Sequence, residues 1–271
     1  MSAATPLDQP RAIGAAMVSS KIGPRGSCID GLRQSGALKL LFPKRHDTVE
    51  AILINTAGGI TGGDRFDVAA TAGPGSKLVL STQASERAYG AQKSQTGRIH
   101  TTLNADENST LFWLPQETIL YQEAALHRRL EINLAETAQF LMVEPILFGR
   151  KAMGEDVTTL SFRDEVDIRC CGKSIYRDGV LLEGNVAQQL DRPAIANGAR
   201  AMASIMWKAP QAQGKLNDVR HILGETGGAS LLNADLMVMR LLAPDGFELR
   251  RSLLPVLDLL TENTLPQTWR L

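Results

Sequence analysis

The sequence has few cysteines and no excess of charge of either sign. Its 271 residues include only three cysteines, Cys28, Cys170 and Cys171. Such a small, odd number gives no disulfide framework and is typical of a reducing compartment. Basic and acidic residues number 29 each, whereas a protein that neutralises nucleic-acid phosphates needs an excess of cations. The composition therefore favours a protein with no nucleic-acid partner.

The sequence also lacks a recognisable targeting segment and a long apolar run. The N-terminal stretch MSAATPLDQPRAIGAAMV has no basic start followed by an apolar core, and Asp8, Pro10 and Arg11 interrupt it. No segment reaches the roughly 20 apolar residues that a membrane-spanning helix needs. We therefore predict a cytoplasmic protein without membrane contact.

Short runs of alternating polarity dominate the middle of the chain. In KLVLSTQ (77–83), Leu78 and Leu80 lie on one face and Val79 and Ser81 on the other. Similar runs follow at close spacing: RIHTTL, STLFWLP, RLEINL, AQFLMVEPILF, LSFRDEVDIRC and SIYRDGVLLEG. Within the last run, Asp178-Gly179 predicts a hairpin turn. No helical stripe occurs between residues 50 and 185, so alternating βα units are excluded and an all-β middle is predicted.

Helical periodicity appears only near the C-terminus. The stretch GKLNDVRHILGETGG predicts a short helix that ends at Gly224 or Gly227. A predicted strand, LMVMRLLA, precedes FELRRSLLPVLDLLTEN, whose apolar residues recur at helical spacing. This second stripe consists of Leu249, Leu253, Val256, Leu257 and Leu260.

Pro255 leaves the start of the second helix open. It fits the first turn of a helix capped by Ser252, or it interrupts a helix that has already begun at Phe247. With either start, the sequence predicts a mainly β protein with about two α-helices near the C-terminus. We expect a single domain over residues 1–271, with residues 1–12 as a candidate disordered tail.

The stretch NTAGGITGGDRF (55–66) resembles a phosphate-binding loop but fails the chemical requirements. A Walker loop needs Lys and then Ser or Thr after its last glycine, whereas Asp64 follows Gly63. The glycine spacing also fails the dinucleotide fingerprint, and the following DRFDVAATAG alternates like a strand. The sequence therefore predicts a tight turn between strands, built on Gly58, Gly59, Gly62 and Gly63.

Local catalytic and metal motifs are absent from the sequence. It contains no G-x-S-x-G, H-E-x-x-H or C-x-x-C motif. The four histidines are far apart along the chain: His46, His100, His127 and His221. On a strand, Cys170 and Cys171 would point to opposite faces, so we interpret both as packing residues rather than joint metal ligands.

Several segments together resemble one known family. They are NTAGGITGGDRF, SKLVLSTQASERAY, LPQETILYQEAALHRRLEINL and VEPILFGRKAMGE, followed by VMRLLAPDGFELRRSLL and LPQTWRL. In this order and spacing they resemble the urease accessory protein family UreD, also called UreH, from about residue 13 to residue 271. Each segment alone is weakly specific, but the ordered set is specific.

The resemblance implies a fold and a function. The implied fold is a β-helix-like stacking of strands with two helices. The implied function is that of a chaperone, not an enzyme, which binds the urease apoprotein and recruits UreF and, through it, the GTPase UreG. That assembly inserts nickel into urease with GTP hydrolysis. GTP would then bind UreG and not this chain, which is expected to hold no tightly bound cofactor and to contact nickel transiently.

Carboxylates in the segments that carry the resemblance are the candidate nickel-path residues: Asp64, Glu144 and Glu155. Nickel accepts carboxylate, imidazole and thiolate ligands, and its passage needs weak sequential sites because a tight cage would retain the ion. Each residue has a structural alternative. Asp64 would cap the turn, Glu144 would form a buried ion pair with Arg150, and Glu155 would be an exposed loop charge.

Leu253 and Leu257 in the second helical stripe and Trp269 near the chain end are candidate contacts with UreF. Alternatively, the stripe packs on the protein's own sheet and Trp269 anchors the tail. Two other functions stay open. A stand-alone nickel storage or sensor protein is disfavoured by the paucity of His and Cys, and an independent enzyme is disfavoured by the missing catalytic motifs.

Overall fold

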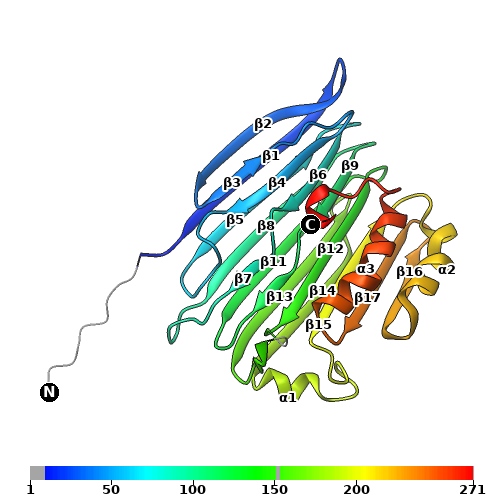
Figure 1. Ribbon diagram of the computed structural model, residues 1–271. Coiled ribbons are helices and arrows are strands. Elements are labelled where there is room, and N and C mark those ends of the chain that lie inside the picture. Colours follow the sequence, from blue (N-terminus) through cyan, green and yellow to red (C-terminus); the bar gives the residue numbers. More distant parts are fainter. Residues whose placement is uncertain (1–9, 151–152, 271) are drawn as a thin grey trace, which may run out of the picture.

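The protein is built from two stacked β-sheets with helices packed on one of them (Figure 1). The structure is a computed structural model that describes residues 10–150 and 153–270. Of the candidate disordered tail, residues 1–9 lie outside this description. Arg11 and Ala12 are described, and each makes hydrogen bonds: Arg11 donates to Gln92 over 3.2 Å, and the amide of Ala12 donates to Asp64 over 2.7 Å.

One sheet has seven strands. In spatial order they are β14 (Lys173–Gly184), β13 (Leu160–Cys170), β11 (Ala125–Leu134), β8 (Gly97–Ala105), β5 (Arg65–Ala72), β1 (Ile13–Gly23) and β2 (Gly26–Gly36). β1, β5, β8, β11 and β13 are parallel, and β2 and β14 pair antiparallel at the two edges. Buried and exposed residues alternate along most of these strands, so one face of the sheet packs inward and the other faces solvent.

The second sheet has ten strands. Its main path is β16 (Gly227–Asn233), β17 (Leu236–Ala243), β15 (Ala201–Lys208), β12 (Gln139–Phe148), β9 (Thr110–Leu114), β6 (Lys77–Thr82), β4 (Val49–Asn55) and β3 (Leu38–Leu41). The short strands β7 (Glu86–Ala88) and β10 (Thr118–Leu120) extend it, with β10 pairing to both β7 and β12.

The central strands follow a coil that crosses between the sheets. β4, β6, β9 and β12 pair in parallel in one sheet, and β5, β8, β11 and β13 do so in the other. Along the chain, strands of the two sets alternate, so each coil adds one strand to each sheet. The predicted β-rich, β-helix-like fold is therefore confirmed, as is the all-β middle of the chain.

Within the described residues, α-helices occur only after residue 185. They are α1 (Val186–Leu190), α2 (Ala212–Leu223) and α3 (Gly246–Leu260), with 3₁₀ turns η2 (Gly224–Thr226) and η3 (Gln267–Arg270). α2 and α3 confirm the two predicted helices, and α2 ends at Gly224, whose φ is +64°. The five-residue α1 was missed because one turn of helix is too short to show a period.

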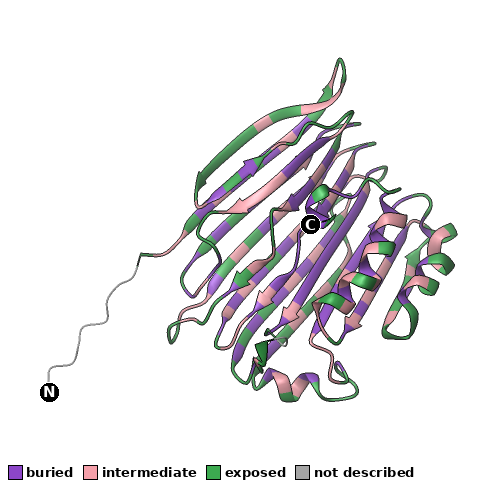
Figure 2. Ribbon diagram, viewed as in Figure 1, coloured by how far each residue is buried: buried purple, intermediate pink, exposed green. Residues whose placement is uncertain are grey.

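The protein has two apolar cores, one on each side of the ten-stranded sheet (Figure 2). The larger core fills the space between the sheets, and the smaller one lies between the ten-stranded sheet and helices α2 and α3. β12 is buried along most of its length because it has a core on both faces, which explains its continuous apolar run FLMVEPILF. The predicted stripe of α3 is entirely buried in the smaller core.

Two local predictions were wrong. The hairpin between β13 and β14 turns at Cys171-Gly172, where both φ angles are positive, and Asp178-Gly179 lies inside β14. Consequently Cys171 is exposed and is not a packing residue. α3 begins at Gly246, capped by Asp245, which accepts a 3.0 Å hydrogen bond from the Glu248 amide. Of the two starts that the sequence left open, the earlier one near Phe247 is therefore observed: Pro255 is inside the helix, and Ser252 is not its cap.

None of the helices in the described residues is long and apolar enough to cross a membrane.

The packing of α3 predicts unequal responses at two of its positions. Leu253 is fully buried, so Leu253→Ala is expected to lower the free energy of unfolding by about 2–5 kcal/mol. Phe247 on the same helix is 74% exposed, and Phe247→Ala is expected to change it by about 0.5 kcal/mol or less. Urea unfolding followed by circular dichroism measures both, and equal losses would show that α3 does not pack as described.

Candidate functional site

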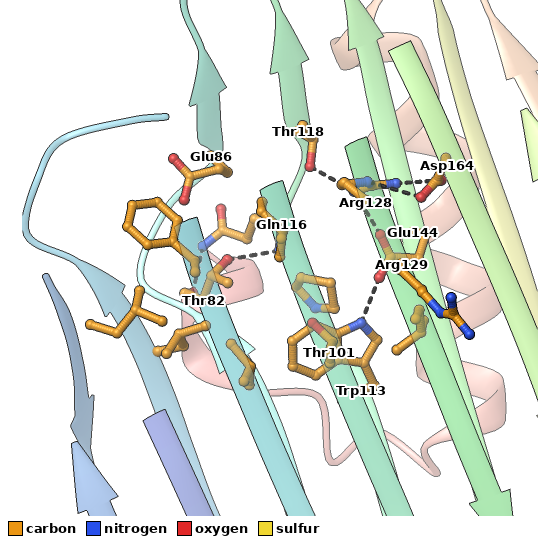
Figure 3. A pocket seen from close by; sticks show the side chains of 17 residues that line it. Thr82, Glu86, Thr101, Trp113, Gln116, Thr118, Arg128, Arg129, Glu144 and Asp164 are labelled. Atoms are coloured by element: carbon orange, nitrogen blue, oxygen red, sulfur yellow. Dashed lines mark hydrogen bonds and ion pairs between the residues drawn. The ribbon is translucent and has the colours of Figure 1, made fainter. Parts of the chain in front are cut away.

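A small cavity lies between the two sheets and contains the most unusual polar groups of the interior (Figure 3). Its volume is about 70 Å³, enough for a few water molecules. Much of the lining is apolar, as expected for the space between two sheets. The ionisable residues that line it are Glu86, Arg128, Arg129, Glu144 and Asp164, of which Arg129 directs its side chain to solvent.

Arg128 connects charged groups of both sheets. Its guanidinium contacts Asp164 of β13 over 2.6 Å and Glu144 of β12 over 2.8 Å. It also donates to the hydroxyl of Thr118 over 2.9 Å, and Trp113 donates its indole N–H to Glu144 over 2.6 Å. Since Arg128 and Asp164 belong to the seven-stranded sheet and Glu144 to the ten-stranded sheet, the guanidinium bridges the two layers (Figure 3).

The strand geometry explains how these charges become buried. Along β11, His127 and Arg129 point to solvent and Arg128 between them points inward. Arg128 lies directly opposite Asp164 in the parallel pairing of β11 and β13. The three charged residues are 8–9% exposed. Buried charges at this depth require partners, and these side chains supply one another.

The cluster contains two carboxylates and one cation. Burial opposes the charge of Arg128, but Asp164 and Glu144 outweigh it and raise the pKa of its guanidinium. The pKa of Glu144 is also raised, chiefly by burial and additionally by the negative charge of Asp164, in spite of the nearby Arg128. With all three groups ionised, the cluster has a net charge of −1. A proton or another cation would neutralise it.

Glu86 is a further carboxyl group beside the cavity. The side-chain amide of Asn55 donates to both of its oxygens over 3.1–3.2 Å. Burial raises the pKa of Glu86, and the negative charge of Asp64 contributes in the same direction. Sequence reasoning missed this residue, although it lies in the family-like segment SKLVLSTQASERAY, because SERAY shows no pattern that separates an inward-facing carboxylate from an exposed one.

The glycine stretch forms a turn that uses its own polar groups. Asp64 is buried, and its carboxylate accepts hydrogen bonds from the amides of Ala12 and Thr61 over 2.7 and 2.8 Å. Gly59 has φ of +154°, and a Cβ there would collide with the ring of Tyr89 and the carbonyl of Arg87. These contacts support the interpretation of Asp64 as the cap of a tight turn that also fixes the start of β1.

Glu155 lies apart from the cavity lining. It pairs with Arg150 over 3.0 Å, and the Arg150 guanidinium stacks on the ring of Tyr121 at 4.6 Å. Hydrogen bonds from Arg150 lower the pKa of the Glu155 carboxyl. The expected pair between Glu144 and Arg150 is therefore wrong: Arg150 pairs with Glu155, and Glu144 pairs with Arg128.

The three candidate nickel-path residues do not form one site. Of the three, only Glu144 lines the cavity. Asp64 lies outside the lining and acts on the charge of Glu86, and Glu155 pairs with the surface residue Arg150. Within residues 10–150 and 153–270, no three His, Cys, Asp or Glu side chains are grouped so that they could hold a metal ion. Glu144 and Asp164 both contact the guanidinium of Arg128 beside the cavity.

The candidate partner contacts are buried in this chain. Leu253, Leu257 and Trp269 are 0–1% exposed. Trp269 donates its indole N–H to the carbonyl of Leu114 over 2.9 Å, and the guanidinium of Arg250 lies over its ring at 5.4 Å. In this conformation none of the three side chains can reach a partner.

The buried cluster predicts a pH-dependent cost for removing its cation. Arg128→Met would leave Glu144 and Asp164 buried without it and is expected to cost about 3–5 kcal/mol of unfolding free energy near neutral pH. The pKa of Glu144 is already raised by burial, and loss of the cation would raise it further above its unfolded value. Protonation of Glu144 then favours the folded state, so the cost is expected to shrink as the pH falls towards about 5.

Urea unfolding at neutral and mildly acidic pH tests this expectation. Arg129→Met is the matched control, since Arg129 is the next residue of β11 and its side chain is 55% exposed. Its expected effect is within about 0.5 kcal/mol. A cost at Arg128 that stays constant with pH would contradict the assignment of the two carboxylates to this guanidinium.

The turn predicts different effects at adjacent glycines. Gly58→Ala places a Cβ in open space at φ of +77° and is expected to cost about 1 kcal/mol. Gly59→Ala adds a collision to the backbone strain and is expected to cost about 3 kcal/mol. Thermal unfolding of the two variants provides the comparison, and similar melting temperatures would count against the close approach of Tyr89.

Comparison with known sequences identifies the family of the chain. The family model described as "UreD urease accessory protein" matches residues 14–270. A urease accessory protein UreD of Roseobacter denitrificans is 64% identical over 271 residues, covering 100% of this chain and 99% of that protein. The UreD protein of Ruegeria sp. (strain TM1040) is 49% identical, and the match covers 97% of this chain and 91% of that protein. The UreD protein of Agrobacterium fabrum is 41% identical, and the match covers 98% of this chain and 94% of that protein. The chain belongs to the UreD urease accessory protein family.

Proposed function

We propose that this protein is a cytoplasmic urease maturation factor that acts as a scaffold and not as an enzyme. It binds the urease apoprotein and, with UreF and the GTPase UreG, promotes GTP-dependent insertion of nickel into the urease active site. Family membership over almost the whole chain supports the role in urease maturation. The binding of UreF and UreG and the GTP-dependent insertion of nickel are the mechanism that we propose for this role.

The observation that supports a direct role in nickel handling is the charge imbalance at Arg128. Two buried carboxylates share one guanidinium beside a cavity between the sheets. Nickel accepts carboxylate oxygens, and a divalent cation near Glu144 and Asp164 would relieve their mutual repulsion. Two such oxygen donors bind an ion weakly, which suits a cargo that must be passed on.

The division of labour with UreG is compatible with the glycine stretch. Amides that a phosphate would need are engaged within the protein: Gly58 donates to Asn55, and Thr61 donates to Asp64. The negative charge of Asp64 would also repel a phosphate. We therefore assign GTP to UreG, and nickel to this chain only as a passing cargo.

Glu144→Gln tests the nickel proposal without dismantling the cluster. Glutamine keeps one oxygen, which can accept from either Trp113 or Arg128, and removes the excess negative charge. Because the pKa of Glu144 is raised in the folded protein, the neutral side chain is expected to leave stability unchanged or slightly higher. The variant should still assemble with UreF, UreG and apo-urease, and activate urease several-fold more slowly at limiting nickel.

Co-purification followed by activation with nickel, bicarbonate and GTP provides the measurement. Glu131→Gln is the matched control because Glu131 lies on the solvent face of β11, 31% exposed. If Glu144→Gln activates urease at the wild-type rate, the cluster of Arg128, Glu144 and Asp164 takes no part in nickel transfer. Retention of nickel by the isolated chain through gel filtration would instead favour a storage protein.

A further inference from the structure

A row of basic side chains crosses the solvent-facing side of the seven-stranded sheet. Strand pairing places Arg65 of β5 opposite Arg98 of β8, Arg98 opposite His127 of β11, and His127 opposite Arg163 of β13. All four point outward, because their neighbours along each strand are buried or inward-facing. We name these four residues the arginine row. Neighbouring strands lie about 4.8 Å apart, so the row is a compact line of positive charge.

Like charges directly opposite one another across a sheet destabilise it. Arg163 and His127 are relieved because both contact Glu165, over 2.7 and 2.8 Å. Arg65 and Arg98 are adjacent and exposed, and neither has an ion-pair partner among the described side chains. Asp67, one outward position further along β5, faces His100 in the next row. The sheet therefore holds two arginines side by side without local compensation.

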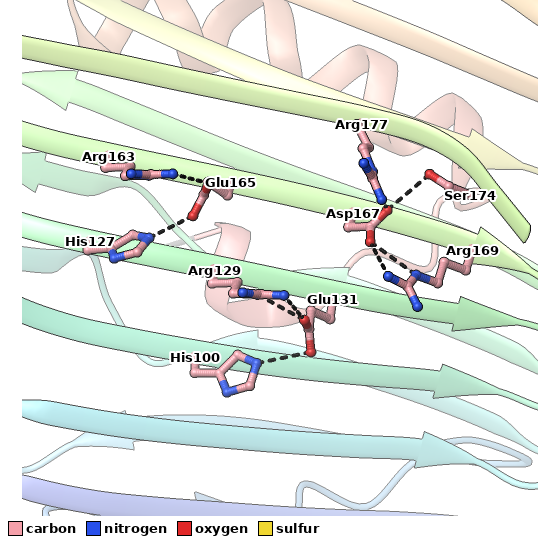
Figure 4. A network of polar contacts seen from close by, with 10 residues as sticks. All are labelled: His100, His127, Arg129, Glu131, Arg163, Glu165, Asp167, Arg169, Ser174 and Arg177. Carbon is pink, nitrogen blue, oxygen red and sulfur yellow. Dashed lines mark hydrogen bonds and ion pairs between the residues drawn. The ribbon is translucent and has the colours of Figure 1, made fainter. Parts of the chain in front are cut away.

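Several other charged groups on this face compensate one another (Figure 4). Glu131 contacts Arg129 and His100, and Asp167 contacts Arg169 and Arg177. Hydrogen bonds from Arg163 and His127 lower the pKa of Glu165 to about 2. Among these charges, Arg65 and Arg98 are adjacent positive groups without a described ion-pair partner, and both are exposed to another molecule.

Exposed apolar side chains lie at both ends of the row. The pairing of β1 with β5 puts Ile13 opposite Arg65, and that of β13 with β14 puts Leu181 opposite Arg163. Ile13 is 66% exposed and Leu181 63% exposed. Six neighbouring strands thus each contribute one outward side chain to a line that is apolar at both ends and basic between them. At the usual strand spacing this line is about 24 Å long.

We propose that the arginine row docks an acidic helical segment of the urease apoprotein, an inference that rests on the proposed function. Residues three or four positions apart on a helix have Cβ atoms about 5–6 Å apart, close to the spacing of Arg65 and Arg98. An acidic helix laid along the row would pair its carboxylates with these arginines and place apolar residues on Ile13 and Leu181. The apolar ends and the zero net charge of the chain favour a protein over a nucleic acid.

The test compares binding of apo-urease to three forms of the chain across a range of salt concentrations. They are wild type, the double variant Arg65→Ser with Arg98→Ser, and the control Arg169→Ser. Arg169 lies on the same face but pairs with Asp167. The double variant is expected to bind about tenfold more weakly at low salt and to lose most of the salt dependence. The control should bind within about twofold of wild type.

Binding by the double variant with wild-type affinity and salt dependence would overturn the docking surface while leaving the proposed function intact, provided urease is still activated. If the wild-type chain neither binds nor activates apo-urease, both the docking surface and the proposed function are wrong. Tighter binding of a duplex DNA oligonucleotide than of apo-urease, lost in the double variant, would assign the row to nucleic acid instead. Thermal unfolding checks that both serine variants remain folded.

Discussion

The buried guanidinium of Arg128 is the interaction on which the interior of the protein depends. It is a buried point where a charged side chain of one sheet reaches a carboxylate of the other, within a layer that is mostly apolar. A second pair between the sheets, Arg240 of β17 with Asp178 of β14, is more exposed. Burying such a group costs several kcal/mol unless it is fully paired. The residues that pair it, Asp164 and Glu144, exceed it by one negative charge when all three groups are ionised.

The same alternation that buries Arg128 also builds the outer surface. His127, Arg128 and Arg129 are consecutive, yet the two-residue period of β11 sends the first and third to solvent and the second to the interior. His127 joins the arginine row, Arg129 pairs with Glu131, and Arg128 links the sheets. A one-residue slip of β11 would exchange these environments, so the parallel pairing with β8 and β13 fixes both the interior charge cluster and the basic row.

Local patterns in the sequence were sufficient for most strands between residues 65 and 184, for β17 and for the two longer helices. They were insufficient for partners across the fold. The alternation of LMVMRLLA and the stripe around Leu253 depend on near neighbours, and β17 and α3 confirm them. Asp178-Gly179 has the composition of a turn, but the positive φ angles at Cys171-Gly172 decided where β13 reverses. Glu144 was correctly expected to need a cation. That cation is Arg128 and not Arg150, because strand pairing brings Arg128 to Glu144, and spacing along the chain does not reveal this pairing.

The C-terminal region limits where partners can bind. Arg250 of α3 donates to Glu117 over 2.6 Å and covers Trp269, and Arg45 donates to the carbonyls of Thr264 and Leu265 over 3.2 and 3.4 Å. These contacts attach α3 and the chain end to the ten-stranded sheet. The apolar stripe that would have been an attractive docking face is thereby used within the protein. The seven-stranded sheet, in contrast, has a solvent-facing side that no helix of the described residues covers (Figures 1 and 2). A partner that joined this face would leave both cores undisturbed, because the side chains on it contribute to neither.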